Sequence, residues 1–394
     1  MSARNIALLA LCQAVLMTGT SLLVSTSALV GRELAGDPRL ATIPLGLQFL
    51  AMTVATIPIS LFMERFGRRA GFLVGVSLGL SGAALAAWAI AADRYLIFCA
   101  AAVMLGAFNG TGQFYRFAAA DVVGAAYRSR AISLVLAGGI AAGFFGPNLA
   151  AWTRTLLPMN FAGSYLSLVV LYVVSLSAIA LLRIPRPTET ARTEVGRPLG
   201  EIARQPAFVV AVLGATVGYG VMNLVMVATP LAMEGYAHAF GDTAFVIQFH
   251  VLGMFVPSFF TGHLIRRFGE TTIMGAGVML LALCVALNES GHGVWHFWAA
   301  LISLGVGWNF LFIGGTSLLT ETYRESEKAK VQAANDFTVF ATVTVTALSS
   351  GALLDGLGWR TLNLLVLPFL GAVLAALLWL RTSRTAVEPG RVAD

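Results

Sequence analysis

The sequence has few charged residues and very little cysteine. Only 11% of its 394 residues are Asp, Glu, Lys or Arg, whereas a soluble domain carries about 25%. The three cysteines, Cys12, Cys99 and Cys284, lie in separate apolar segments, which excludes a disulfide framework. The chain also lacks a phosphate-binding glycine loop, a carboxylate pair and a nucleophile beside a base. We therefore expect no enzyme and no cofactor.

Apolar residues are abundant and form long continuous runs. They make up 58% of the chain, and the mean hydropathy is +0.82. One helical crossing of a bilayer needs about 20 such residues, and continuous runs indicate helices rather than alternating barrel strands. The sequence predicts an all-α membrane protein with twelve transmembrane spans, near residues 6–30, 41–63, 71–91, 95–119, 131–151, 163–183, 207–233, 243–265, 271–289, 294–320, 331–355 and 360–381.

A polar segment divides the twelve spans into two groups of six. Residues 184–206 contain Pro, Thr, Arg and Glu but no apolar run. We expect them to form a cytoplasmic linker between two six-helix bundles, residues 1–183 and 207–381, with a cytoplasmic tail at 382–394. Most of the 25 Lys and Arg residues lie in the linker, the tail and alternate loops. This bias predicts that both ends of the chain are cytoplasmic, and it explains the net charge of +6 without nucleic acid.

The two groups of spans also resemble each other. The sequence ERFGRR at residues 64–69 recurs as RRFGET at 266–271, Asn109 matches Asn309, and RSRAIS from Arg128 matches KAKVQA from Lys328. These matches share nearly one offset, so they indicate an internal duplication. A repeat of this size is typical of transporters built from two parallel bundles.

The loop after the second span resembles a known signature. SLFMERFGRRAG from Ser60 is similar to the G-x-L-x-D-R-x-G-R-R loop of the major facilitator superfamily, with glutamate in place of aspartate. The resemblance implies a monomeric multi-pass transporter of the bacterial inner membrane, whose halves rock about a central site. It assigns a gating role to the loop residues Glu64, Arg65, Gly67, Arg68 and Arg69.

Two neighbouring spans carry methionine and histidine at helical spacing. Met222 and Met226 are four residues apart, as are His250 and Met254, so each pair shares a helical face. In antiparallel spans rising ~1.5 Å per residue, Met222 is level with Met254 and Met226 is level with His250. Thioethers select Cu(I), so these four residues are candidate copper ligands. Core packing is the alternative interpretation of the methionines.

The same four residues carry a more specific resemblance. M-x-x-x-M followed by H-x-x-x-M in the next span is similar to the double motif of the CcoA-type bacterial copper importers. That resemblance implies import of copper ions across the inner membrane for cytochrome oxidase assembly.

The alternative is a small organic substrate such as riboflavin, because bacterial riboflavin transporters are related to those importers. Polar and aromatic side chains in the fourth and tenth spans provide candidate contacts for such a substrate: Asn109, Gln113, Tyr115, Arg116, Trp308 and Asn309.

Overall fold

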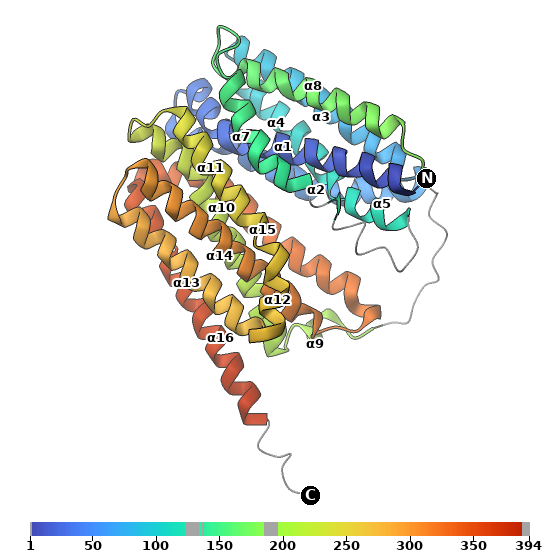
Figure 1. Cartoon of the computed structure of the whole chain (residues 1–394), viewed down its shortest axis with the longest axis vertical. Helices are drawn as coiled ribbons and strands as arrows, with labels where there is room; N and C mark the ends of the chain where they lie inside the picture. The colour runs from blue at the N-terminus through green and yellow to red at the C-terminus, as the bar shows by residue number, and fades with distance from the viewer. Residues whose placement is uncertain (1, 123–133, 136–137, 185–195, 388–394) are drawn as a thin grey trace, which may run out of the picture. The chain divides into compact units, whose positions relative to one another are not determined.

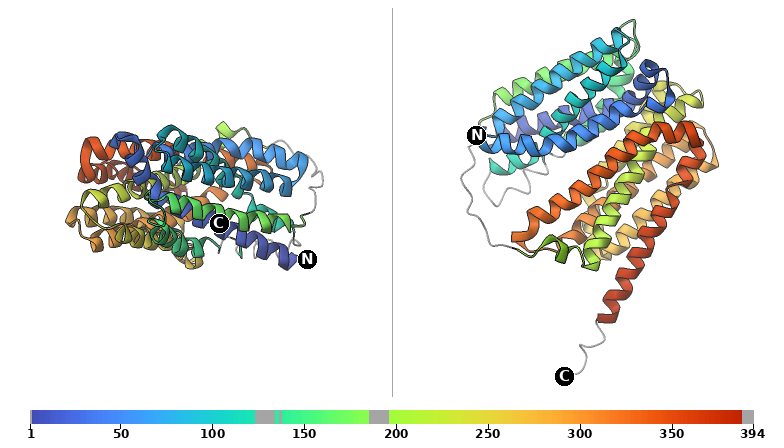
Figure 2. Two further views of the ribbon diagram at one scale, coloured as in Figure 1. Left: turned by 90° about the horizontal axis from the view of Figure 1, so that it is seen from above. Right: turned by 180° about the vertical axis from the view of Figure 1, so that it is seen from behind.

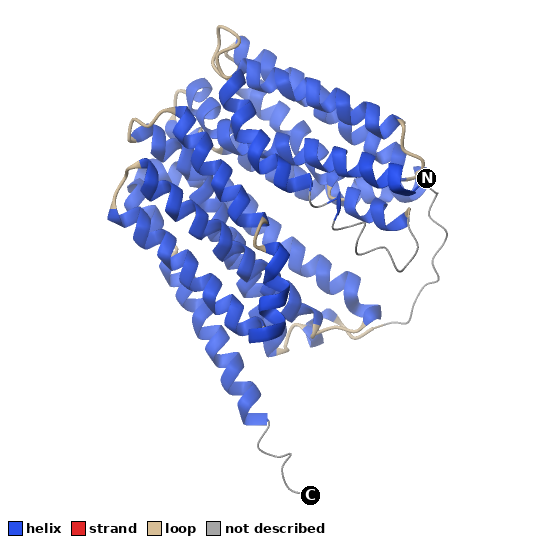
Figure 3. Ribbon diagram, in the orientation of Figure 1, coloured by secondary structure: helices blue, strands red, loops and turns tan. Residues whose placement is uncertain are grey.

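A computed structural model describes residues 2–122, 134–135, 138–184 and 196–387 of the chain. Within these ranges every regular element is a helix (Figure 3). The prediction of an all-α protein is confirmed.

The helices of the first half follow the predicted spans closely (Figure 1). They are α1 (Ser2–Ala35), the short 3₁₀ helix η1 (Pro38–Leu40), α2 (Ile43–Phe66), α3 (Arg68–Ala91), α4 (Tyr95–Gly112), α5 (Tyr115–Asp121), α7 (Gly138–Thr153) and α8 (Ala162–Ala180).

The second half begins after the polar segment. Its helices are α9 (Leu199–Ile202), α10 (Pro206–Gly235), α11 (Phe240–Phe255), α12 (Ser258–Phe268), α13 (Glu270–Ser290), α14 (Val294–Thr320), the 3₁₀ helix η3 (Glu325–Glu327), α15 (Lys328–Leu364) and α16 (Leu367–Val387).

Nine helices in the described ranges are long and apolar enough to cross a membrane, or ten if α11 and α12 form one bent span. One of the nine, Lys330–Ser383, has 54 residues. This stretch comprises α15 and α16, which have 37 and 21 residues. At ~1.5 Å per residue, each is long enough for one crossing of a hydrocarbon core of ~30 Å. The chain is therefore a multi-span membrane protein, while the count of twelve and the cytoplasmic ends stay predictions.

Three predicted spans differ from the observed helices. The span near 243–265 bends by 44° between α11 and α12, because Pro257 at this junction lacks an N–H for the helical ladder. The span near 95–119 is interrupted between α4 and α5 at Gln113 and Phe114. In α15, Gly358 has a φ of 76°, which breaks the helix close to the predicted loop between the last two spans.

The chain divides into two compact units. Unit 1 comprises Met1–Thr190, Met226–Leu252 and Thr344–Gly356, and unit 2 comprises Ala191–Val225, Gly253–Val343 and Leu357–Asp394. Unit 1 thus includes parts of the second sequence half. The predicted boundaries at 183, 206 and 381 describe the sequence repeat, and they stay predictions.

Unit 1 is built around a large apolar core. Helix α1 packs against α7 and α8, α3 packs against α4 and α8, and α2 packs against α4. Figure 2 shows these helices, coloured blue to green, from two further sides. Aromatic rings fill the space between these helices. Those of Phe108 and Tyr172, for example, meet edge to face with centroids 4.8 Å apart.

Unit 2 is organised by the pairing of α13 with α14, and α16 and α12 also pack on α13. The first pair approaches closely at two glycines. A Cβ atom on Gly277 would lie 2.8 Å from the Gly307 carbonyl oxygen, and one on Gly307 would lie 2.9 Å from that of Gly277. Only glycine allows the two backbones to be this close.

The repeated loops share one backbone conformation. Gly67 between α2 and α3 has φ 89° and ψ 155°, and Gly269 between α12 and α13 has φ 81° and ψ 155°. Each glycine N–H donates to the carbonyl four residues earlier, at Met63 or Ile265, over 2.8 Å. The sequence match between these loops therefore extends to their geometry.

Candidate functional site

The signature loop joins α2 to α3 in unit 1. Arg69 Nη2 donates to the Ala180 carbonyl at the end of α8, 2.5 Å away, where a cation complements the helix dipole. Arg65 is exposed and lies 5.3 Å from the Phe66 ring centroid, and Arg68 is half-buried. The side chain of Glu64 lies outside the described residues, so the gating role of the loop stays a prediction.

The four predicted copper ligands are buried side chains on α10 and α11. Met222 and Met254 belong to unit 2, whereas Met226 and His250 belong to unit 1. In the described ranges, no three His, Cys, Asp or Glu side chains form a metal-binding group. Buried methionines of this kind are common as packing residues in helical cores.

Asn309 has a structural role that its sequence position did not reveal. Its Nδ2 donates to the Met254 carbonyl and to Ser258 Oγ, both over 2.7 Å, and its Oδ1 accepts from Thr261 Oγ1 over 2.7 Å. These bonds fasten α14 to both sides of the bend at Pro257. The side chain predicted to contact substrate is thus engaged within unit 2.

The polar residues predicted on the fourth span lie in different surroundings. Asn109 Oδ1 accepts from Thr20 Oγ1 on α1 over 3.4 Å. Tyr115 is fully buried in the core of unit 1, with its ring 4.7 Å from that of Phe72. Gln113 and Arg116 are half-buried at the break between α4 and α5. Of these, Tyr115 is a packing residue.

Trp308 lies in an aromatic cluster of unit 2 that comprises Tyr219, Phe255, Trp308, Phe312 and Phe340. Trp308 and Phe312 are four residues apart on α14 and stack with centroids 5.2 Å apart and an interplanar angle of 10°. Tyr219 on α10 meets both rings edge to face, at 5.2 and 5.6 Å. Phe255 lies 6.3 Å from Trp308, and Phe340 lies 6.3 Å from Tyr219.

This aromatic cluster provides faces and edges of π systems from four helices. Trp308 itself is only 6% exposed, whereas the other four rings are half-buried. Offset-stacked and edge-to-face geometries are the arrangements that aromatic rings favour. These contacts pack the five rings against one another within unit 2. Sequence analysis identified Trp308 alone, although the Trp308–Phe312 spacing already predicted a shared face.

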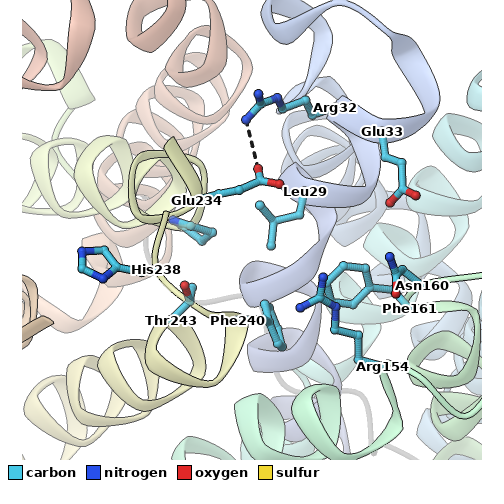
Figure 4. Close-up of a pocket in the computed structure, with 11 residues that line it drawn as sticks. Leu29, Arg32, Glu33, Arg154, Asn160, Phe161, Glu234, His238, Phe240 and Thr243 are labelled. Atoms are coloured by element: carbon cyan, nitrogen blue, oxygen red, sulfur yellow. Dashed lines mark hydrogen bonds and ion pairs between the residues drawn. The ribbon is translucent and has the colours of Figure 1, made fainter. Parts of the chain in front are cut away.

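Unit 1 contains a polar pocket of about 410 Å³. Arg32 Nη1 pairs with Glu234 Oε2 over 3.0 Å, and Figure 4 shows both side chains among the residues that line the pocket. The Arg154 guanidinium lies 4.9 Å from the Phe161 ring and 5.3 Å from the Phe240 ring. The remaining lining residues are Leu29, Glu33, Asn160, Pro230, His238 and Thr243. The predicted orientation puts these helix ends on the periplasmic side.

Unit 2 contains an ion pair between Arg197 and Glu327 that sequence analysis missed. Glu327 is fully buried and accepts from the Arg197 N–H, Nε and Nη2 at 2.7 to 2.8 Å, and from the Arg324 N–H at 2.9 Å. The Arg197 hydrogen bonds, followed by that of Arg324, hold the pKa of Glu327 well below its usual range. Hydrogen bonds to Glu327 likewise raise the pKa of Arg197. The pair therefore stays ionised at neutral pH.

Known proteins with similar sequences are transporters. Riboflavin transporter RfnT of Brucella anthropi is 42% identical over 378 residues, which cover 95% of this chain and 95% of the relative. Two transporters of Bacillus subtilis, the uncharacterized MFS-type proteins YddS and YdeG, are 26% and 25% identical over 90% of this chain and 84% and 85% of their own lengths.

The prediction of copper import is wrong. The relative that matches nearly the full length at 42% identity is named for riboflavin, and no comparison supports a metal. The error has a physical reason. Helical spacing and depth put Met222 with Met226, and His250 with Met254, on common faces, but they do not determine what those faces contact. We therefore do not assign these four residues to a copper site.

The family itself is established by two overlapping matches along the chain. The model described as Major Facilitator Superfamily matches residues 9–288 and again residues 215–393. Together with the apolar helices, this confirms a non-enzymatic transporter that spans the inner membrane several times. The chain belongs to the Major Facilitator Superfamily.

Proposed function

We propose that this chain imports riboflavin across the inner membrane. The observation that carries the proposal is the 42% identity to a riboflavin transporter over 95% of both chains. The direction of transport is part of the proposal.

The aromatic cluster supports a flavin as the substrate. Riboflavin is an uncharged molecule at neutral pH, with a planar three-ring system and a polyhydroxylated chain. Its ring system is of a size to stack on Trp308 or Phe312, while Tyr219 offers an edge. Each such aromatic contact contributes about 0.5–1.5 kcal/mol beyond the burial of apolar area.

Uptake of labelled riboflavin tests the proposal. The chain is produced in cells that neither synthesise nor import riboflavin, and uptake is measured beside growth on limiting riboflavin. We expect the wild type to restore both. Trp308→Ala removes the central ring of the aromatic cluster, and we expect its uptake at low riboflavin to fall by about tenfold or more, since each 1.4 kcal/mol is a factor of ten.

Trp379→Ala is the matched control. Trp379 on α16 is 49% exposed, and it lies outside the aromatic cluster. This variant should transport as the wild type does at equal membrane levels. Wild-type uptake no higher than background would contradict riboflavin as the substrate. Equal uptake by Trp308→Ala and Trp379→Ala would show that the aromatic cluster does not bind the substrate.

A further inference from the structure

The indole N–H of Trp308 is a buried donor without an acceptor. Nε1 is closed to water, and no hydrogen-bond partner for it exists among the described residues. The whole side chain is only 6% exposed. Buried polar atoms in folded proteins nearly always have a partner in the protein, in water or in a ligand. A donor in this position is available to an acceptor from outside the described residues.

The hydroxyl oxygen of Thr216 is a second buried polar atom without a partner among the described residues. Thr216 lies on α10 three residues before Tyr219, so both share a helical face. Its Oγ1 is buried and has no partner in the described part of the chain. Threonine hydroxyls within helices often bond the carbonyl four residues earlier, as Thr261 does with Pro257 over 2.8 Å. Thr216 does not.

The rings of the aromatic cluster connect these two atoms. Tyr219, which shares the face of Thr216, meets the Trp308 ring at 5.2 Å. Aromatic faces bind any planar ring system, because stacking does not depend on the atoms at the edge of the ligand. A hydrogen-bond donor makes binding depend on those edge atoms, because a ligand without an acceptor leaves the donor unpaired.

We infer that Trp308 Nε1 is the specificity-determining donor of this site, and that it recognises a carbonyl on the edge of a planar heteroaromatic ring. Thr216 Oγ1 supplies a second hydrogen bond to the same edge. The inference rests on the proposed function and deepens it: riboflavin carries two ring carbonyls separated by an N–H. The bond forms when the ligand ring enters the aromatic cluster beside Trp308.

Trp308→Phe separates this role from stacking, because phenylalanine keeps an aromatic ring and loses the donor. Two planar probes differ in whether they carry a ring carbonyl. Lumichrome has three fused rings with two carbonyls on its edge, whereas phenazine has three fused rings whose acceptors are two ring nitrogens and no carbonyl. Binding of each probe to the purified full chain in detergent is measured by equilibrium dialysis, and riboflavin uptake gives KM and the maximal rate.

Trp359→Phe is the matched control. Trp359 also has a buried Nε1 without a partner in the described ranges, but its ring lies against Phe297 at 5.5 Å, away from the aromatic cluster. We expect Trp308→Phe to weaken lumichrome binding about tenfold and to leave phenazine binding unchanged. KM for riboflavin should rise by a similar factor while the maximal rate stays. Thr216→Val should shift the same preference by a smaller factor.

The outcomes distinguish this inference from the proposed function. If Trp308→Phe and Trp359→Phe prefer lumichrome to phenazine equally, or if the wild type binds no lumichrome, Trp308 is not the donor. If lumichrome binding depends on Trp308 but the wild type takes up no riboflavin, the donor role stands and the proposed transport of riboflavin is wrong.

Discussion

The two copies of the internal repeat share a contact between corresponding helices but make it with different side chains. In the first copy, Arg69 at the start of α3 donates to the Ala180 carbonyl at the end of α8. In the second, Arg381 on α16 donates to Thr271 Oγ1 and Thr272 Oγ1 at the start of α13, at 3.2 and 2.6 Å. The corresponding helices meet in both copies, with the arginine on the opposite partner. A contact between two helix ends is thus retained while its chemistry changes.

The matched asparagines diverge further. Asn109 accepts one bond from Thr20, whereas Asn309 makes three bonds that fasten the bend between α11 and α12. The bend lies at Pro257, whereas α2 of the first copy continues through Pro58 without a break. A repeat position therefore determines where a side chain lies along its helix, and the local backbone determines what that side chain does.

The largest expected effect concerns a residue that differs between the copies. At the repeat offset of 200, Glu327 corresponds to Tyr127, which lies outside the described residues. Glu327→Ala leaves the Arg197 guanidinium and two backbone N–H groups without their carboxylate. We expect the largest loss of thermal stability of the variants considered, measured by unfolding in detergent. Asp355→Ala, which removes the exposed partner of Arg39, is the control with little effect.

The pH dependence of the same variant sharpens the test. The pKa of Glu327 is lowered in the folded chain, below the ordinary value of about 4.3. The ion pair therefore stabilises the chain above that value, and this contribution is lost as the pH falls through the lowered pKa. Wild type should lose its advantage over Glu327→Ala only in strong acid. An advantage that disappears near pH 6 would contradict the role of this carboxylate.

The next effect tests whether unit 2 depends on close backbone approach. In Gly277→Ala the new methyl group meets the Gly307 carbonyl at 2.8 Å. Backbone cannot move aside cheaply, so we expect a loss of about 1–3 kcal/mol. Gly275→Ala is matched on the same helix, where a Cβ has no neighbour within 4 Å, and should be neutral or slightly stabilising. Equal melting temperatures for both variants would show that α13 and α14 adjust freely.

The repeated loop glycines provide a symmetric comparison. Gly67 and Gly269 have nearly equal backbone angles, in a region that is strained for residues with a Cβ atom. We expect Gly67→Ala and Gly269→Ala each to cost about 1–3 kcal/mol and to do so by similar amounts. Gly262→Ala in α12 is the open helical control. Unequal costs in thermal unfolding would mean that the surroundings of the loops, rather than their shared conformation, determine the effect.

The smallest expected effect is that of the ion pair at the polar pocket. Arg32 and Glu234 have side chains 44% and 53% exposed, so water screens their attraction. A double-mutant cycle with Arg32→Gln and Glu234→Gln should give a coupling energy below about 1 kcal/mol. The readout is thermal unfolding at low and high salt. A larger, salt-insensitive coupling would show that the pair is shielded from solvent in the membrane-embedded protein.

The sequence alone determined the fold class, the membrane location and the superfamily. Long apolar runs in a chain with little charge have no stable arrangement except helices in lipid, because each backbone group must be bonded within its own segment. The loop at residues 64–69 and its copy at 266–271 identified the superfamily, since their glycines and arginines recur at one spacing. Such local patterns can be read without knowing how the helices are rotated.

Tertiary structure alone decided which side chains meet. Helical spacing showed that Met222 shares a face with Met226, but not that this face is buried against other helices, and so it led to copper. It placed Asn309 and Trp308 side by side, although one fastens a bend and the other lies in an aromatic cluster drawn from four helices. Helix rotation and neighbour choice depend on the packing of all helices together, and no single segment of sequence contains that information.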